Sequence, residues 1–254
     1  MTNRYVLISG GASGIGRTIA EAFLADGADV HICDVSADAI AEFTAANPTA
    51  TATAADISNA DDVARMYAGI SKLDILVNNA GISGPSAGVD DVPKDEWDAC
   101  ISVNLSGAFY MTRLAVPLLK QSSAGCIINM ASSAGLFGTP MRSPYAASKW
   151  GLIGLTKTWA MELGPDNIRV NAVCPGCVSG PRIDGVIERD AKKRGVSADK
   201  VRAVYERQSS MRTFVSPDDI AETVLFMASE KAGKISGQTI SVDGHTESLA
   251  MWMN

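Results

Sequence analysis

The chain has 254 residues, a length that suits one large α/β domain and can bury a sizeable core without disulfides or metals. Its hydrophobic fraction of 46% and charged fraction of 20% are those of a soluble globular protein, and its net charge of −6 argues against a nucleic-acid-binding face. Because the sequence has no apolar run of about 18 residues and no secretory signal, we expect a cytoplasmic protein without a membrane span.

Short β-branched runs alternate with longer amphipathic stretches along the chain. The predicted strands are residues 5–9, 29–34, 51–56, 74–79, 126–130, 169–174 and 238–243. One predicted helix follows the first strand and ends at Gly27, and the others lie at about 36–46, 59–70, 94–121, 145–164, 184–207 and 217–229. Because parallel strands need crossover connections, this alternation predicts an α/β fold: a doubly wound, seven-stranded parallel sheet with helices on both faces.

We expect residues 1–254 to form a single domain, since the sequence has no repeat, low-complexity segment or linker. Residues 180–213 are more charged than their surroundings and are inserted between a strand and the last helix. A long insertion of this kind is typical of a lid, so we predict a substrate-covering segment here. A solvated helical excursion is the alternative.

The cysteine and histidine content argues against a metal site. The five cysteines are an odd number and lie mostly in apolar, strand-like runs, which indicates buried free thiols in a reducing compartment. Cys174 and Cys177 form a CxxC, but it encloses Pro-Gly and has no second pair, so we interpret it as a loop. His31 and His245 are the only histidines, and we predict no metal ion.

The segment SGGASGIG, residues 9–16, places Gly10, Gly14 and Gly16 between an apolar strand and a helix. A dinucleotide-binding turn has this setting, because glycines let backbone N–H groups approach a pyrophosphate at a positively polarised helix N-terminus. We include Ser13 and Ile15 of the same turn among the predicted cofactor-binding residues. The spacing is GxxxGxG rather than GxGxxG, and a tight strand–helix junction without a ligand is the alternative interpretation.

Asp34 ends the second predicted strand, where an acidic side chain can accept hydrogen bonds from an adenosine ribose. A carboxylate there repels a 2′-phosphate, and neither Ser13 nor Val35 supplies a compensating cation. The sequence therefore favours NAD over NADP. Arg17 is the nearest positive charge, but it falls in the helix, where a surface role is equally expected. A surface cap is the alternative role for Asp34.

Tyr145 and Lys149 are four residues apart, so on a helix they share one face. A free tyrosine has a pKa near about 10, too high for a base at neutral pH. A neighbouring ammonium stabilises the phenolate and lowers that pKa, which suits acid–base chemistry. Such a YxxxK pair arises often by chance, so its meaning depends on the other motifs.

These motifs follow one order over nearly the whole chain: GxxxGxG at 10–16, NNAG at 78–81, Asn104, Ser132, YAASK at 145–149 and PG at 175–176. On these residues the sequence resembles the main branch of the short-chain dehydrogenase/reductase family. The resemblance implies a Rossmann-like seven-stranded sheet, a homotetramer or homodimer, and reversible hydride transfer between NAD and a secondary alcohol or ketone.

The resemblance also implies catalytic roles for four residues. Tyr145 is expected to be the general acid/base, and Lys149 to lower its pKa and hold the nicotinamide ribose. Ser132, thirteen residues before Tyr145, is expected to orient the substrate oxygen, with Ser133 as the competing candidate. Asn104 is expected to anchor a water in a proton relay. A helix-kinking side chain bonded to the backbone is its alternative role.

Further cofactor contacts are implied in the same way. Asp56 and Ile57 are expected to contact the adenine, and Val35 to lie at the cofactor beside Asp34. The loop under the cofactor is expected to contain Asn78, Ala80 and Gly81. Pro175 and Gly176 are expected to border the nicotinamide, and Val178 to bond its carboxamide through the backbone. For Asn78 and the neighbouring Asn79, stabilisation of the central strands is an equal alternative to direct contact. The usual threonine after the PG motif is replaced by VSGPR, which leaves the carboxamide contacts less specified than the chemistry.

The substrate is predicted to be a small polar alcohol or ketone, such as a hydroxy acid or a sugar-like compound. Three arginines lie in segments expected to line its pocket: Arg142, Arg182 and Arg212. Guanidinium groups there can clamp a carboxylate, sulfonate or phosphate, and Arg142 and Arg182 join Ser132 and Tyr145 as predicted substrate-binding residues. Exposure to solvent or pairing with Asp184, Glu188 or Asp190 is the favoured alternative.

Two rival functions make different predictions for this sequence. An NADPH-dependent 3-oxoacyl-type ketoreductase of the same family predicts a basic residue near Ser13 or Val35, and none is present. A non-catalytic dinucleotide-sensing regulator is expected to lose the catalytic Tyr or Lys, yet Tyr145 and Lys149 are both in place. The sequence therefore favours the NAD-dependent dehydrogenase.

Overall fold

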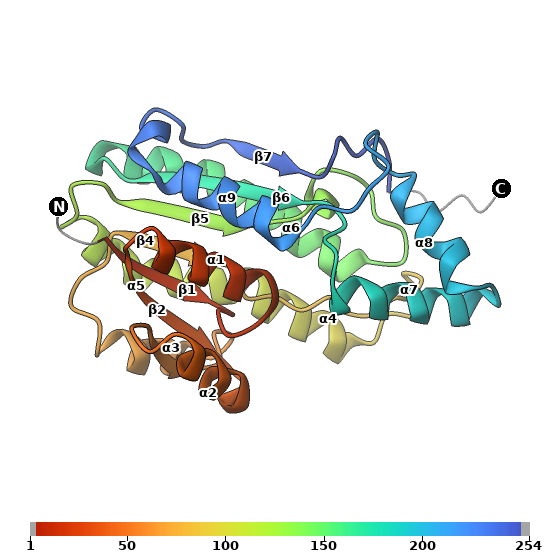
Figure 1. Cartoon of the computed structure of the whole chain (residues 1–254), viewed down its shortest axis with the longest axis horizontal. Coiled ribbons are helices and arrows are strands. Elements are labelled where there is room, and N and C mark those ends of the chain that lie inside the picture. The colour runs from red at the N-terminus through yellow and green to blue at the C-terminus, as the bar shows by residue number, and fades with distance from the viewer. Residues whose placement is uncertain (1–3, 250–254) are drawn as a thin grey trace.

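The structure, a computed structural model, describes residues 4–249 and is built around a seven-stranded parallel sheet (Figure 1). The strands are β1 Tyr5–Ser9, β2 Asp29–Asp34, β3 Thr51–Ala54, β4 Ile75–Asn78, β5 Cys126–Met130, β6 Arg169–Pro175 and β7 Thr239–Val242. They lie in the order β3-β2-β1-β4-β5-β6-β7, and every neighbouring pair is parallel. The predicted doubly wound sheet is confirmed.

Helices cover both faces of this sheet (Figure 1). They are α1 Gly14–Ala25, α2 Ala37–Ala46, α3 Ala60–Tyr67, α4 Lys94–Ile101, α5 Gly107–Leu119, α6 Ser143–Leu163, α7 Pro181–Arg194, α8 Ala198–Glu206 and α9 Pro217–Ala228. Shorter helical turns are the π-turn Ser102–Ser106 and the 3-10 turns Ser133–Gly135, Gly164–Asp166 and Glu230–Ala232. In the part of the chain that is described, none of the helices combines the length and the apolar character that crossing a membrane requires.

The two faces bury separate apolar clusters because successive strand residues point to opposite sides. Ile8 of β1 packs in one cluster with Phe23 of α1 and Val224 of α9. Leu7, the neighbouring residue, packs in the other with Met111 of α5. Both clusters are almost free of solvent contact, as expected for a parallel sheet covered on both faces.

The strand order reverses between β1 and β4, which are hydrogen-bonded neighbours although two strands separate them in the chain. In doubly wound sheets the crevice beyond the carboxyl ends of the strands at this switch point is where ligands bind. The glycine turn follows β1 there, Asp34 ends β2, and Ser132 comes just after β5. The fold therefore brings the predicted site residues to one edge of the sheet.

The helix predicted over residues 94–121 is present from Lys94 to Leu119, but it contains a π-helical turn that the sequence pattern does not predict. The structure has α4, then a π-helical turn at Ser102–Ser106, then α5. The Asn104 side chain in that turn bonds the main chain of Ile82 on a separate loop, so a tertiary contact stabilises the wider turn. Single π-turns within helices occur frequently at functional sites.

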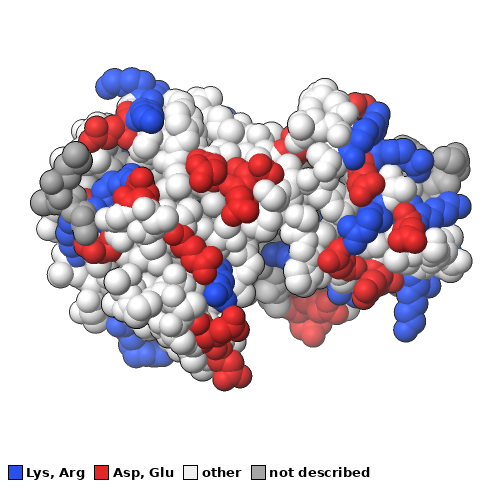
Figure 2. Space-filling view, in the orientation of Figure 1, with Lys and Arg blue, Asp and Glu red and all other residues white. Residues whose placement is uncertain are grey.

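The prediction of a single helix over residues 184–207 is wrong, since the structure divides this segment into α7 and α8. Gly195 adopts a left-handed conformation with φ of 65°, which ends α7, and Ser197 then caps α8 by accepting a hydrogen bond from Lys200 N at 3.3 Å. Ile187 and Val201 join the two helices in a small apolar cluster of their own. This pair projects from one end of the sheet, and the surface narrows to a waist beside it (Figures 1 and 2).

All five cysteines are free thiols, and all but Cys177 are buried. Burial raises the pKa of the Cys33 thiol to about 12 and that of Cys174 to about 11. Cys174 and Cys177 of the CxxC are not bonded to each other. Within residues 4–249 no group of three or more His, Cys, Asp or Glu side chains is arranged to hold a metal ion.

Candidate active site

The glycine turn forms a close-packed junction with an open N-terminal end of α1. Gly10 N donates to Cys33 O at 2.7 Å, and a side chain at Gly16 would overlap the Gly10 carbonyl. Gly14 has a φ of +53°, and a Cβ built there would meet no atom within 4 Å. The Ser13 side chain makes no capping hydrogen bond, so it leaves the first N–H groups of α1 to other partners. This open end fits a pyrophosphate.

Asn79 holds the glycine turn against the end of β4. Its Nδ2 donates to Ser9 O at 3.0 Å and to Gly10 O at 2.9 Å. In return, Ser9 Oγ accepts hydrogen bonds from the main-chain N–H groups of Asn79 and Ala80, both at 3.1 Å. These contacts are those of the strand-stabilising role that the sequence leaves open for Asn79, which comes directly after the strand that neighbours β1.

Asn78 instead lies in a buried polar row across the sheet. Its Nδ2 donates to Thr112 Oγ1 at 3.0 Å and to Asn129 Oδ1 at 2.8 Å, and Asn129 in turn donates to Thr156 Oγ1 at 2.9 Å. This row connects β4 and β5 with α5 and α6. The contacts are those of the strand-stabilising alternative, while a direct contact of Asn78 with a cofactor stays a prediction.

Asp34 is half-buried at the end of β2, and its carboxylate faces the start of the glycine turn. Its Oδ2 accepts from Ala12 N and its Oδ1 from Ser36 N, both at 3.2 Å. Beside it Val35 is 71% exposed, an unusual position for an apolar side chain. Arg17, the nearest cation by sequence, is engaged by two carboxylates, Glu21 and Glu42, each at 2.8 Å.

The other predicted adenine-side and nicotinamide-side residues occupy varied environments. Asp56 is exposed, and its Oδ1 accepts from Ser58 N at 2.9 Å and Ser58 Oγ at 2.7 Å. Ile57 is buried against Gly107, where a Cβ would come within 2.7 Å of it. On the nicotinamide side, Pro175 ends β6, Gly176 packs against Asp243, and Val178 forms an isolated parallel bridge with Val215.

Tyr145 and Lys149 lie one turn apart on α6, and Ser132 adjoins them from the loop after β5. Lys149 is buried, and its Nζ donates to Met130 O at 2.8 Å and lies 5.6 Å from the centre of the Tyr145 ring. Ser132 Oγ accepts from Ala134 N at 3.2 Å and hydrogen-bonds the Tyr145 side chain. The structure thus brings three of the predicted catalytic residues together.

The surroundings of Tyr145 lower its pKa below the ordinary value of 10.0. Burial acts to raise this pKa, but the positive charge of Lys149 opposes burial, assisted by Arg182, the hydrogen bond from Ser132 and the charge of Arg142. Burial also lowers the pKa of Lys149, while the Tyr145 phenolate counteracts that effect. The phenol is thus prepared to exchange a proton.

Asn104, the fourth predicted catalytic residue, is buried in the π-turn beside Lys149. Its Oδ1 accepts from Ile82 N at 2.8 Å, and its Nδ2 donates to Ile82 O at 2.9 Å and to Ser148 Oγ at 3.1 Å. A Cβ at Gly81 would lie 3.1 Å from Asn104 Oδ1 and 3.6 Å from Lys149 Nζ, so these two polar groups border one spot. The main-chain bonding role is present, and the water relay stays a prediction.

Two of the three carboxylates that could neutralise the pocket arginines are bound to other partners, and the third, Glu188, is in none of the ion pairs within residues 4–249. Asp184 pairs with Arg202, and Asp190 pairs with Arg194 at 2.7 Å. Among the ion pairs formed within residues 4–249, none includes Arg142 or Arg182. The third arginine, Arg212, donates to a main-chain carbonyl, that of Arg207.

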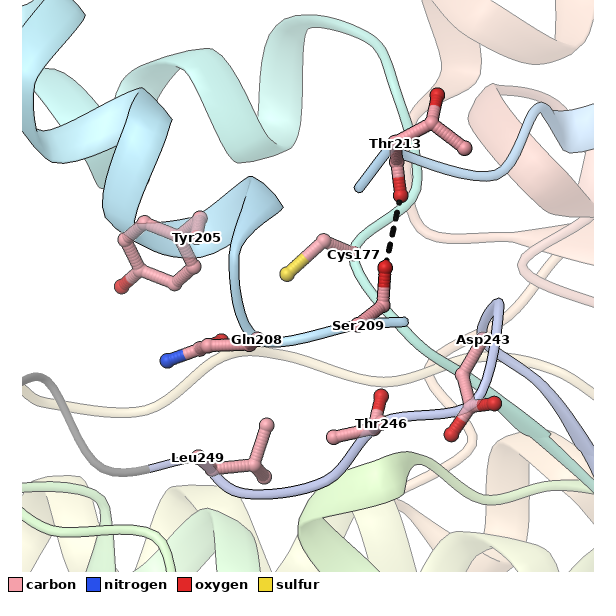
Figure 3. Close-up of a pocket in the computed structure, with 8 residues that line it drawn as sticks. All are labelled: Cys177, Tyr205, Gln208, Ser209, Thr213, Asp243, Thr246 and Leu249. Atoms are coloured by element: carbon pink, nitrogen blue, oxygen red, sulfur yellow. Dashed lines mark hydrogen bonds between the residues drawn. The ribbon is translucent and has the colours of Figure 1, made fainter. Parts of the chain in front are cut away.

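A small pocket lies next to this site, between the end of α8 and the segment after β7 (Figure 3). It is lined by Cys177, Tyr205, Gln208, Ser209, Thr213, Asp243, Thr246 and Leu249. Ser209 Oγ donates to Thr213 O at 3.4 Å across it. None of the four predicted catalytic residues lines this pocket, so it is distinct from the catalytic centre.

Comparison with known proteins identifies the family. The family model described as enoyl-(acyl carrier protein) reductase matches residues 10–245. The chain is 38% identical to the D-beta-hydroxybutyrate dehydrogenase of Cupriavidus necator, over 96% of this chain and 98% of the relative. The chain belongs to the short-chain dehydrogenase/reductase family. It thus shares its fold and its arrangement of motifs with oxidoreductases that use nicotinamide cofactors.

Other members of the short-chain dehydrogenase/reductase family support this assignment with different named activities. The 3-oxoacyl-(acyl-carrier-protein) reductase of Thermotoga maritima is 33% identical over 96% of this chain and 98% of its own length. A crystal structure of NAD+-bound xylitol dehydrogenase superposes with a TM-score of 0.89 at 27% identity, covering 95% of this chain and 98% of the other. The family and fold are therefore shared across substrates of several kinds.

Proposed function

We propose that this short-chain dehydrogenase/reductase transfers a hydride between NAD and a small polar secondary alcohol or ketone, with Tyr145 as the general acid/base. The observation that carries the proposal is the convergence of Ser132, Tyr145 and Lys149 at the carboxyl edge of the sheet, with the pKa of Tyr145 lowered. A proton acceptor beside a nicotinamide-binding turn is what alcohol oxidation requires.

In the direction of alcohol oxidation, the substrate hydroxyl would lie between Ser132 Oγ and the Tyr145 phenolate. Bound NAD supplies the hydride acceptor at the nicotinamide ring. Tyr145 would accept the hydroxyl proton as the carbinol carbon loses its hydride, so that the O–H and C–H bonds both break. A carbonyl forms, and Tyr145 then releases the proton toward solvent. Ser132 holds the oxygen, and Lys149 stabilises the phenolate between turnovers.

The proposed cofactor site joins the open end of α1, Asp34 and the loop after β4. The N–H groups at Gly14, Ile15 and Gly16 would receive the pyrophosphate, since the Ser13 side chain does not cap them. Ala80 and Gly81 would lie beneath the dinucleotide, and Lys149 would hold the nicotinamide ribose. Gly81 supports this placement because its lack of a side chain leaves the space beside Lys149 Nζ open. A Cβ at this position would lie 3.6 Å from that atom.

The preference for NAD rests on the charge around the adenosine ribose. Asp34 presents a carboxylate there, and Val35 and Ser13 supply no cation. Arg17, the remaining candidate cation, is neutralised by Glu21 and Glu42. A 2′-phosphate would therefore meet a negative charge without a basic partner, which disfavours NADP.

An NADPH-dependent ketoreductase acting on 3-oxoacyl chains is the second candidate. Its support is the resemblance to the Thermotoga maritima reductase, a protein named for a 3-oxoacyl-(acyl-carrier-protein) substrate. The resemblance to proteins named as hydroxybutyrate and xylitol dehydrogenases favours the first candidate, as both names specify small polar substrates. The ion-paired state of Arg17 separates the two, since an NADPH enzyme needs a free cation near the ribose.

We also propose a homo-oligomer, a tetramer or a dimer, as the resemblance implies. Trp97 on α4, Phe109 on α5 and Trp150 on α6 are large apolar side chains exposed on neighbouring helices. Apolar surface of this kind is typical of interfaces between subunits. Light scattering of the purified protein tests this proposal, and a monomer at micromolar concentration would contradict it.

Two measurements test the proposed function. Calorimetric titration of the protein with NAD and with NADP should give the tighter binding for NAD. A panel of small secondary alcohols, followed by the absorbance of the reduced nicotinamide, should then give turnover with NAD. Tighter binding of NADP would favour the ketoreductase, and binding of neither dinucleotide would contradict both candidates.

A further inference from the structure

Arg142 stands directly before α6, three residues from Tyr145, in an unusual environment. Its guanidinium carbon lies 5.0 Å from the centre of the Tyr145 ring, and its Nη2 donates to Ser83 O at 2.8 Å. Its Nε is buried and has no hydrogen-bond partner among residues 4–249. A permanently charged group is therefore held against the catalytic phenol with part of its donor capacity unused.

Arg182 adds a second positive charge near the same phenol. It lies in the first turn of α7, is exposed, and contributes to lowering the pKa of Tyr145. It forms none of the ion pairs in the described chain. Of the acids of α7 that are candidates for pairing with it, Asp184 and Asp190 are bound to Arg202 and Arg194, and Glu188 pairs with neither pocket arginine. The site thus carries two guanidinium groups that no carboxylate of residues 4–249 neutralises.

A purely structural role accounts for these arginines poorly. One hydrogen bond to Ser83 would anchor the loop without a buried, unpartnered Nε, since an unmade hydrogen bond on a buried polar atom costs stability. Activation of Tyr145 does not require them either, because Lys149 contributes the largest favourable charge. An anion brought by the substrate would supply the missing partner.

We propose that Arg142, together with Arg182, binds a carboxylate of the substrate, so that the substrates are short hydroxy acids and the corresponding oxo acids. This inference rests on the proposed function and specifies its substrate class. Successive carbons are about 1.5 Å apart, so a carboxylate one or two carbons from a carbinol held at Tyr145 reaches the neighbourhood of the stacked guanidinium. The planar guanidinium suits a carboxylate through paired N–H donors.

The test compares acids with neutral analogues of the same shape. Short α- and β-hydroxy carboxylic acids, their methyl esters and their primary amides are assayed with NAD, using wild type, Arg142→Gln, Arg182→Gln and the control Arg189→Gln. Arg189 is an exposed arginine of the same helix α7 and does not contribute to the pKa of Tyr145. Circular dichroism and NAD titration establish that each variant is folded and binds cofactor.

For wild type we expect kcat/KM to be higher for an acid than for its ester or amide. In Arg142→Gln and Arg182→Gln this ratio should fall by about ten- to a hundredfold, mainly through KM, because a charge-assisted hydrogen bond is lost. Arg189→Gln should keep the wild-type ratio. If the arginines acted only through the pKa of Tyr145, their replacement would lower the turnover of acid and ester alike. The ratio of kcat/KM for acid to kcat/KM for ester would then stay unchanged, and this result would overturn the proposal.

Failure of this inference is separable from failure of the proposed function. If neutral alcohols are oxidised as well as the acids by wild type, the carboxylate site is wrong and the dehydrogenase activity stands. If no compound is oxidised, the proposed function fails, and calorimetry still tests the site. NADH-loaded wild type should bind a short oxo acid at least about tenfold more tightly than Arg182→Gln does. Equal affinity would refute the site.

Discussion

The Nζ atom of Lys149 lies 5.6 Å from the centre of the Tyr145 ring and donates a 2.8 Å hydrogen bond to the carbonyl of Met130. The bond to the end of β5 holds the ammonium at a constant position relative to the phenol on the same helix. Together with its burial, this arrangement makes Lys149 the strongest of the groups that stabilise the Tyr145 phenolate.

The pH dependence of alcohol oxidation should report this arrangement. The pKa of Tyr145 is lowered, so the phenolate fraction and with it kcat/KM should rise with pH through an apparent pKa below about 10. In Lys149→Gln the phenolate loses its main partner, so the apparent pKa should move up and the rate at neutral pH should fall by about a hundredfold or more. Steady-state kinetics from neutral to alkaline pH check this, and a flat wild-type profile is the contrary outcome.

Asp34 should control the choice of cofactor. Asp34→Asn keeps an oxygen that can accept from Ala12 N but removes the negative charge. We expect the ratio of NADP to NAD affinity to rise by about tenfold or more, because the like-charge repulsion of the 2′-phosphate disappears. Asp38→Asn, an exposed carboxylate in α2, serves as the control and should leave the ratio unchanged. If both variants behave alike, Asp34 does not read the ribose.

Asn104 should couple the π-turn to both stability and activity. Asn104→Ala removes the hydrogen bonds to the main-chain N–H and carbonyl of Ile82, a loss of about 0.5–1.5 kcal/mol for each bond, since Ile82 is exposed and water can replace part of them. We expect a lower midpoint in urea and reduced turnover. Gln121→Ala, an exposed change just after α5, should alter neither. An Asn104→Ala protein with unchanged midpoint would show that the Ile82 bonds are dispensable.

His31 should make the fold less stable in mild acid. It is buried between Thr51 Oγ1 at 2.7 Å and Thr53 Oγ1 at 3.0 Å, and burial lowers its pKa below 6.5. The unfolded chain therefore binds a proton at a higher pH than the folded one, so stability is lost as pH falls from about 6.5 toward the folded-state pKa.

The corresponding experiment measures Tm at about pH 7.5 and about pH 5.5. His31→Gln retains polar atoms for the two threonines but does not titrate, so its Tm should fall less between these pH values than that of wild type. His245→Gln, a change at an exposed histidine, is the matched control and should follow wild type. An equal drop in Tm for wild type and His31→Gln would rule out His31 as the cause.

The alternation of apolar runs was sufficient to predict the sheet. β1, β2 and β5 begin and end where the sequence pattern places them. β3 stops at Ala54 instead of residue 56, because Asp56 bonds Ser58 locally and leaves the strand. Local chemistry of this kind sets boundaries more finely than periodicity does.

The π-turn depends on a contact distant in sequence, whereas the end of α7 depends on a local signal. The π-turn at Asn104 is stabilised by Ile82, 22 residues earlier, and no periodicity of residues 94–121 contains that partner. Gly195 was a visible signal for a helix end, and its left-handed conformation is the reason that α7 stops. A glycine followed by a capping serine could have predicted that break.

In the candidate site, too, some features were predictable from the sequence and others depended on the fold. Tyr145, Lys149 and Ser132 were predictable from motif order, and the fold brings them together. The clamp of Asn79 on Ser9 and Gly10 joins segments about 70 residues apart, as the β1–β4 neighbour relationship requires. The stacking of Arg142 on Tyr145 could not be predicted either, because it depends on the conformation of the loop before α6. Motifs therefore indicate the chemistry, and the fold determines what surrounds it.

The most direct test of the proposed chemistry is Tyr145→Phe, which removes the phenolic oxygen and keeps the ring. The NAD affinity of this variant, measured by calorimetry, should stay within about twofold of wild type, while oxidation of the best alcohol substrate should fall by at least about a hundredfold. Turnover of Tyr145→Phe at the wild-type rate would contradict the assignment of Tyr145 as the general acid/base.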